Sequence, residues 1–403
     1  MKNFLRATAA AAAVLSLISC GGGTTVPQVI GEIPVPTNPP KFSFDIGFVD
    51  SGHYYVTDRT NQSLDVFDTT TLASTAVIKG GATPFAGVVN NANGSANNDK
   101  SGPDGVVAIP GTSILYVGDA GSVKVVDASL KQVIANIPIP SFSSTGTPGA
   151  PPTVFRADEG CYDPDDQLMM FAHPGDSPVF ATWISTKAGD NYKIVAQYPF
   201  MTATGGLEQC AYDHASASFY LNNDATPTNT HGEVDIFTAA SVKSGNPVIS
   251  TSPAPFPLDK CNPTGLALGP GTDMIVMCAP DPGDPLISYI FNRTNGTKLA
   301  TVKLGGADQV AYDSVSNRYF LALRYWSDTG ISNISSANAA SSPLFQPILG
   351  VVDASSYAIV AKVPAGRNCH SVAVDGPNHK AFVPHDSGAT AFPNTGVTVV
   401  STQ

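Results

Sequence analysis

Residues 369–403 read CHSVAVDGPNHKAFVPHDSGATAFPNTGVTVVSTQ, and the pattern of this stretch decides the fold. It contains a short apolar strand, a turn, a second strand, a loop and a third strand, and there the sequence ends. Earlier stretches of the same kind continue into a fourth strand. The fourth strand of the last stretch is therefore expected elsewhere in the chain.

The same pattern recurs along the chain. The first strands of the repeats read FDIGFVD, PDGVVAIP, DEGCYDP, LEQCAYD, NPTGLALGP, ADQVAYD and CHSVAVD. A second apolar strand follows each, as in HYYVTD and ILYVGD, and third and fourth strands such as SLDVFD and YAIVAKVP come next. Four short strands that recur about every 40 to 60 residues are typical of a β-propeller. The sequence predicts an all-β, seven-bladed propeller of four-stranded blades, with two stacked sandwiches as the alternative.

The stretch PQVIGEIPVP, near the N-terminus, matches the fourth strands of other repeats, such as KQVIANIPIP. We predict that residues 28–35 complete the seventh blade by pairing beside residues 396–401. Closing the ring with both ends of the chain leaves no open seam between the first and last blades. The propeller is expected to span residues 28–403.

The composition excludes some classes of partner. Hydrophobic residues make up 42% of the chain and charged residues 13%, with 37 Gly and 33 Pro, which suits a β-rich protein with many turns. The net charge is -11, and no Lys/Arg cluster provides the positive surface that nucleic acids require. We expect a monomer that binds a small molecule or a metal ion and no nucleic acid.

The N-terminus has the pattern of an export signal. Residues 1–19 carry Lys2 and Arg6 before an apolar run that is too short to span a bilayer. The run ends in Leu-Ile-Ser-Cys, which resembles the bacterial lipobox, in which Cys20 is lipidated. The resemblance implies a lipid anchor, most simply in the outer membrane and facing the periplasm or the cell surface, with residues 20–27 as a flexible tether. An ordinary secretory leader is the alternative.

Export to an oxidising compartment makes disulfides possible. Cys261 and Cys278 flank an inner hairpin and are predicted to face each other. Cys161 and Cys210 lie in the first strands of adjacent repeats, and we predict that they pair as well. Cys369 would then be free.

The motifs also resemble a known family. Tyr55-Val56-Thr57-Asp58 followed by SLDVFD, together with YVGDAGSVKVVD, is similar to the YVTN/YncE-like seven-bladed propellers of bacteria. The resemblance covers residues 28–403 and implies the fold. It says little about chemistry, because lactonase-like, lyase-like and purely binding propellers share this general architecture.

Polar residues gather where the chain enters the innermost strands, at one mouth of the expected channel, called here the near mouth. This ring of side chains is expected to include Asp45, Asp104, Asp158, Glu159, Glu208, Asn262, Asp308 and His370. His173, His231 and His385 follow second strands and are expected at the same mouth, with His385 beside His370. Arg324 also follows a second strand, where it could hold a ligand anion or pair with a ring acid.

Such a ring allows three interpretations. Asp158, Glu208, Asp308 and His370 could hold Ca²⁺, Mg²⁺, Mn²⁺ or Zn²⁺, the ring could bind an organic ligand, or it could line a water-filled structural channel. Binding is the leading functional hypothesis. A metal-assisted hydrolase or lyase, lactonase-like, with Glu208 or His370 as general base is the alternative. An envelope scaffold is third, and it would need apolar outer strands, which the sequence does not suggest.

Overall fold

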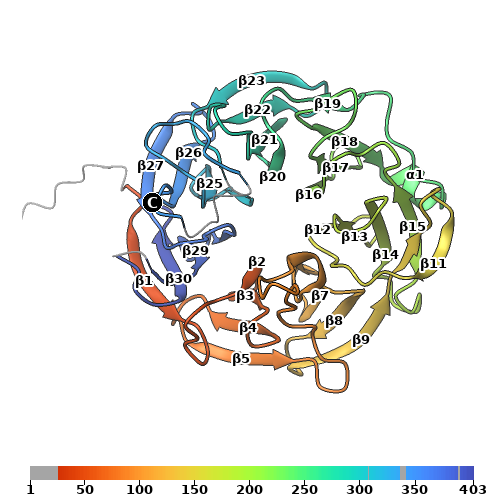
Figure 1. The fold of residues 1–403 in the computed structure, drawn as a ribbon, viewed down its shortest axis with the longest axis horizontal. Helices are drawn as coiled ribbons and strands as arrows, with labels where there is room; N and C mark the ends of the chain where they lie inside the picture. The colour runs from red at the N-terminus through yellow and green to blue at the C-terminus, as the bar shows by residue number, and fades with distance from the viewer. Residues whose placement is uncertain (1–25, 307, 336–341, 389–390) are drawn as a thin grey trace, which may run out of the picture.

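The computed structural model describes residues 26–306, 308–335, 342–388 and 391–403. These residues form seven four-stranded antiparallel sheets and one two-stranded sheet. The four-stranded sheets stand around a central channel as the blades of a propeller (Figure 1). The predicted all-β, seven-bladed architecture is confirmed.

The first four blades follow one another in chain order. Blade one is β2 (Phe44–Asp50), β3 (His53–Asp58), β4 (Ser63–Asp68) and β5 (Ser74–Lys79). Blade two is β6 (Val106–Ala108), β7 (Ile114–Asp119), β8 (Ser122–Asp127) and β9 (Gln132–Pro138). Blade three is β12 (Gly160–Asp163), β13 (Leu168–His173), β14 (Phe180–Ser185) and β15 (Ile194–Pro199). Blade four is β16 (Leu207–Asp213), β17 (Ser218–Asn223), β18 (Glu233–Thr238) and β19 (Phe256–Pro257).

The remaining blades complete the ring. Blade five is β20 (Pro263–Leu268), β21 (Asp273–Cys278), β22 (Ser288–Asn292) and β23 (Thr297–Val302). Blade six is β24 (Val310–Asp313), β25 (Arg318–Leu323), β26 (Ile348–Asp353) and β27 (Ile359–Pro364). Blade seven is β28 (Ala373–Asp375), β29 (Lys380–His385), β30 (Gly396–Ser401) and β1 (Val29–Pro34).

Three small elements decorate the blades. Strands β10 (Pro140–Phe142) and β11 (Pro148–Pro152) form the two-stranded sheet between blades two and three. The short helix α1 (Ala239–Lys243) follows β18, and the Thr238 side chain caps its first turn by accepting a hydrogen bond from the Ser241 N–H. A 3₁₀ turn covers Asn98–Lys100. No helix in the described part of the chain is long and apolar enough to cross a membrane.

The ring is closed both at the axis and at its rim. The first strand of every blade contacts the first strand of the next, and β28 of blade seven contacts β2 of blade one. At the rim, β1 pairs antiparallel with β30, so that the two ends of the chain share one sheet (Figure 1). Ile33 of β1 is 2% exposed and packs in a core cluster with residues of blades one and seven. The predicted closure by residues 28–35 is confirmed.

Burial explains why the second strands are continuous apolar runs. Each blade packs against a neighbour on both faces, so that β13 (LMMFAH) and β14 (FATWIS) are buried at every position. The outer strands instead expose aliphatic side chains to solvent. These are Val29, Ile30, Val77, Ile134, Leu299 and Ile359. Single exposed aliphatic residues of this kind are common on soluble proteins and do not make the abundant apolar surface that an envelope scaffold would need.

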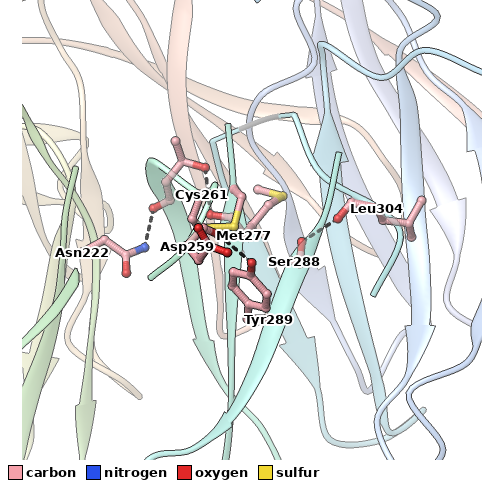
Figure 2. Close-up of a disulfide and its surroundings, with 9 residues drawn as sticks. Asn222, Asp259, Cys261, Met277, Ser288, Tyr289 and Leu304 are labelled. Atoms are coloured by element: carbon pink, nitrogen blue, oxygen red, sulfur yellow. Dashed lines mark hydrogen bonds between the residues drawn. A yellow bond between two sulfur atoms is a disulfide. The ribbon is translucent and has the colours of Figure 1, made fainter. Parts of the chain in front are cut away.

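Two disulfides join the cysteines in the pairs expected from the sequence. Cys161 of β12 is bonded to Cys210 of β16, which links the inner strands of blades three and four. Cys261 is bonded to Cys278 at the end of β21, with a Cα–Cα distance of 4.5 Å. Figure 2 shows this bridge near Tyr289, whose hydroxyl donates a hydrogen bond to the Asp259 carbonyl oxygen at 2.6 Å. Cys369 is free and buried.

Candidate functional site

A polar cavity of about 160 Å³ lies on the axis at the near mouth, and we call it the polar chamber. Its charged lining comes from several blades, because each first strand brings the residues at its entrance toward the axis. The carboxyl groups are those of Asp45, Asp158, Glu159, Glu208 and Asp308. The cationic side chains are Arg59, Arg156 and Arg324, and His370 adds an imidazole.

Local sequence places these groups. Asp45 lies in β2, Glu208 lies in β16, and Asp158 and Glu159 directly precede β12. Arg59 directly follows β3, and Arg324 directly follows β25. The acids therefore lie at or just before the start of first strands. Two of the arginines lie just after the second strands of their blades. Both positions lie at the same end of the antiparallel inner hairpin.

Arg59 is the most deeply buried cation of the chamber. Its Nη2 donates a hydrogen bond to Asp45 Oδ2 at 2.7 Å, and its Nε donates one to Asp104 Oδ1 at 2.8 Å. Asp104 comes from blade two, so this guanidinium joins two blades. Asp104 itself is fully buried behind the chamber and does not line it. Its role here is therefore as a partner of Arg59.

Arg156 forms the second ion-paired group. It lies 2.9 Å from Asp158 Oδ2 and 3.6 Å from Asp45 Oδ2. Burial alone would raise the pKa of Asp45, but Arg59, His370 and Arg156 together hold it well below its usual range. For Asp158 the balance goes the other way, and burial raises its pKa to about 7 although Arg156 opposes the change.

Arg324 and Asp308 form the third ion pair. Arg324 Nη2 lies 2.8 Å from Asp308 Oδ2, and both side chains are about one-fifth exposed, at 21% and 20%. Of the two roles considered for Arg324, pairing with a ring acid is the one that the structure shows. The guanidinium also lies over the ring of Tyr325, at 4.6 Å from the ring centroid.

Glu159 and Glu208 differ from the other acids of the chamber. Neither side chain has a hydrogen bond or an ion pair with any other residue of the described ranges, whereas Asp45, Asp158 and Asp308 each have an arginine partner. Burial raises the pKa of both glutamates well above the usual range, and nearby carboxylates raise it further. Two unpaired carboxyl groups therefore face one small cavity from blades three and four.

Both ring nitrogens of His370 and one face of its ring are in contact with other groups. Its Nδ1 lies 2.7 Å from the Asn368 carbonyl oxygen, and its Nε2 lies 3.3 Å from Asp45 Oδ1. The ring also stacks on Phe44, with 4.5 Å between centroids. Because both nitrogens already face acceptors, the predicted role of His370 as a general base has no support in this geometry.

Several residues predicted for the near mouth do not line the polar chamber. His173 is fully buried between blades and stacks on Phe180, with 4.2 Å between centroids. His385 is also fully buried, and its Nε2 lies 2.6 Å from Oε1 of Glu32, which belongs to β1 of the same blade. Unlike His370, His385 therefore does not line the polar chamber. His231 and Asn262 lie in loops beside each other, where the Asn262 N–H donates to the His231 carbonyl oxygen at 2.9 Å.

The predicted metal ligands are not gathered around one point. Asp158 and Asp308 are held by arginines and His370 by Asp45, which leaves Glu208 as the unpaired member of the set. Across the described ranges, no three His, Cys, Asp or Glu side chains are placed to hold a metal ion together. The arrangement does not fit a preassembled divalent metal site.

Sequence reasoning missed Arg59 and Arg156. The signal for Arg59 was present, because it follows the second strand of blade one as Arg324 follows that of blade six. Arg156 lies in the loop before β12, where only its contact with Asp158 and Asp45 reveals its place.

Comparison with known proteins supports the fold alone. No protein-family model and no curated protein matches the sequence. Among solved structures, a chain of "Kuenenia stuttgartiensis Hydrazine Synthase" is 15% identical and has a TM-score of 0.61, over 92% of this chain and 97% of that one. "Crystal structure of RRP9 WD40 repeats" matches at 8% identity and a TM-score of 0.60, over 94% and 99% of the two chains.

A third similar structure is a chain of "Crystal Structure of Mitotic Checkpoint Complex", at 11% identity and a TM-score of 0.56, over 99% of this chain and 98% of that one. The structural similarity to these proteins establishes a β-propeller fold. At sequence identities this low, it carries no function from one protein to another. The YVTN/YncE-like family stays a resemblance.

Proposed function

We propose that this propeller is an extracytoplasmic binding protein whose polar chamber holds a small cationic ligand at Glu159 and Glu208. The observation that carries the proposal is the pairing pattern of the chamber. Three of its carboxyl groups have arginine partners, and these two have none among the described residues. A buried carboxylate without a partner is costly, and a bound cation with hydrogen atoms to donate would relieve that cost.

The size of the chamber limits the ligand. Its volume of about 160 Å³ is smaller than that of the pockets that bind drug-sized molecules, which is roughly 300–1,000 Å³. An ammonium group on a short carbon chain suits both the volume and the charge. A bare metal ion is less suited, because it would need several oxygen ligands that the arginines now hold.

Calorimetric titration with ethylammonium chloride tests the proposal. The wild-type protein should bind it, and Glu208→Gln should weaken binding by tenfold or more, or about 1.4 kcal/mol. Glu233→Gln is the matched control, because Glu233 lies in β18 and does not line the chamber. Equal binding by all three proteins, or none by the wild type, would reject the cation site. Binding of Ca²⁺ or Zn²⁺ with no binding of ethylammonium would favour the metal alternative.

The pH dependence of that binding follows from the pKa shifts. A cation binds the ionised glutamates, and their raised pKa values keep them protonated at low pH. Affinity for ethylammonium should therefore increase as the pH rises from 5 to 8. An affinity that is constant over this range, in a protein that stays folded, would contradict the involvement of the two carboxyl groups.

The enzyme alternative has less support. Glu208 could transfer protons, since burial raises its pKa above its usual range, as is common for carboxyl groups that act as general acids or bases. The enzyme would also need a bound metal ion to polarise its substrate. The described residues contain no group of three His, Cys, Asp or Glu side chains that could hold one. Binding is therefore the function that this geometry supports best.

Anchoring by lipid remains part of the proposal. Cys20 and residues 1–19 lie outside the described residues, so the lipobox resemblance is its only support. If Cys20 carries the anchor, Cys20→Ala should move the protein from the membrane fraction to the soluble fraction. Unchanged fractionation would reject the anchor.

A further inference from the structure

A second cavity, of about 330 Å³, lies farther along the central channel, and we call it the apolar chamber. Much of its wall is apolar. The residues that provide this wall are Ile46, Phe48, Val106, Val107, Cys161 and Ala211. They come from the inner strands β2, β6, β12 and β16, and β2, β12 and β16 also position groups of the polar chamber.

The two chambers share part of their walls. Ile46 and Glu159 line both. Along β16, Glu208 faces the polar chamber and Ala211 lines the apolar one, and along β2 Asp45 and Phe48 are divided in the same way. The inner strands therefore run from a charged end of the channel to an apolar end.

Glu159 lies at the boundary with its carboxyl group unpaired. The residue is 4% exposed, and its side chain has no hydrogen bond or ion pair with the rest of the described chain. The neighbouring amides are already in use. Gln209 Oε1 accepts from the Leu266 N–H at 2.7 Å, and Gln309 Oε1 accepts from the Val372 N–H at 3.0 Å. Glu159 is therefore the boundary group that a ligand could pair with.

We propose that the channel binds a hydrophobic amine, with the ammonium group at Glu159 and the hydrocarbon part in the apolar chamber. The proposal rests on the proposed cation site and adds the class of ligand. A purely polar cation would leave the apolar chamber to water, which apolar surface disfavours. A neutral hydrocarbon would leave Glu159 unpaired. A molecule with both parts satisfies both chambers.

A series of n-alkylamines tests the inference by calorimetry. Affinity should increase from ethylamine through butylamine to hexylamine, by roughly fourfold for each methylene that enters the apolar chamber. Hexanol, which has the chain without the charge, should bind at least tenfold more weakly than hexylamine. Glu159→Gln should remove most of the difference between hexylamine and hexanol.

A variant that fills the apolar chamber separates this inference from the cation site. Ala211 is partly exposed and lines the apolar chamber, so Ala211→Leu adds volume to the chamber wall. In this variant the gain from ethylamine to hexylamine should disappear while ethylamine binding is kept. Thermal unfolding would check that the variant is folded.

The outcomes distinguish the two proposals. If the wild type binds ethylamine and hexylamine equally, the hydrophobic-amine inference fails and the cation site stands. If neither amine binds, both fail. If hexylamine and hexanol bind equally, the ligand is a neutral hydrocarbon derivative, and the inference is wrong about Glu159.

Discussion

Residues of the same type have different roles in the polar chamber, and burial separates them. The Arg59 side chain is 4% exposed and lies between two buried aspartates, whereas that of Arg324 is 21% exposed. The sequence placed the ring of acids at the near mouth. It could not show which acid each arginine would neutralise, because Arg59 reaches Asp104 of the next blade across 45 positions in the chain. Packing decides which residues of neighbouring blades come into contact, and such contacts follow no regular spacing in the sequence.

Arg59→Met should strongly destabilise the protein, because it leaves Asp45 and Asp104 buried without their shared cation. Loss of one partner from a buried pair typically costs about 3–5 kcal/mol. Arg324→Met is the matched control, since its partly exposed pair with Asp308 is worth about 1 kcal/mol or less. Urea denaturation measures both. Equal losses in the two variants would contradict the difference drawn between them.

His173 shows where placement by sequence failed. It ends a second strand, as the pattern required, but its imidazole is fully buried and stacks on Phe180 of the same blade. Position along a strand locates the near mouth to within a residue or two. The direction of the side chain then decides between channel and core.

The buried His173 gives a prediction about pH. Burial lowers its pKa to about 3, so the folded state stays neutral while the unfolded histidine takes up a proton below about 6.5. The unfolded state then binds more protons, and this contribution to stability falls as the pH drops from 6.5 toward 3. At pH 5 the loss should be about 2 kcal/mol relative to pH 7.5.

The measurement is the difference between the wild type and His173→Phe in urea denaturation at pH 5 and pH 7.5. Other groups also change the stability with pH, and Asp65, whose pKa burial raises to about 8, gives a slope of opposite sign. Because both proteins contain these groups, the difference between them isolates the contribution of His173. His173→Phe should lose less stability on acidification than the wild type. Parallel losses would mean that His173 is not neutral in the folded protein.

Strands differed in how well the sequence predicted them. The second strands match the predicted segments at both ends, as in β3 and β7, because burial on both faces makes them continuous apolar runs. The outer strands were harder. The two-residue β19 was not predicted, since a half-exposed edge strand mixes polar and apolar residues without a clear period. Inner strands came out shorter than their motifs, as in β6, which covers three residues of PDGVVAIP.

Strand β1 offers a test of the seam with a control on the same strand. Ile33 is 2% exposed in the core between blades one and seven, while Ile30 is 48% exposed. Ile33→Ala should cost about 2–5 kcal/mol of stability, and Ile30→Ala should change it by less than about 0.5 kcal/mol. Chemical denaturation of the two variants gives both values. A small effect at Ile33 would mean that β1 does not hold the ring closed.

At the scale of the whole molecule, repeats predicted the propeller because each blade repeats the same solution to burying a sheet. Closure by β1 was also predictable, because its pattern matched the other outer strands. The chemistry of the channel was only partly predictable. It arises from side chains of different blades that meet at the axis, such as Arg156 with Asp45, which lie far apart in the sequence. The division of the channel into a polar and an apolar chamber appears only when the inner strands stand side by side.

The most direct test of the cation site is a crystal structure of the wild-type protein grown with 4-bromophenethylamine. Its ammonium group marks the cation position, and anomalous scattering from its bromine marks the apolar end. We predict the nitrogen within hydrogen-bond distance of Glu159 or Glu208, and the bromine in the apolar chamber near Phe48 and Val107. A channel that holds only water, with bromine peaks confined to the outer surface, would contradict the account.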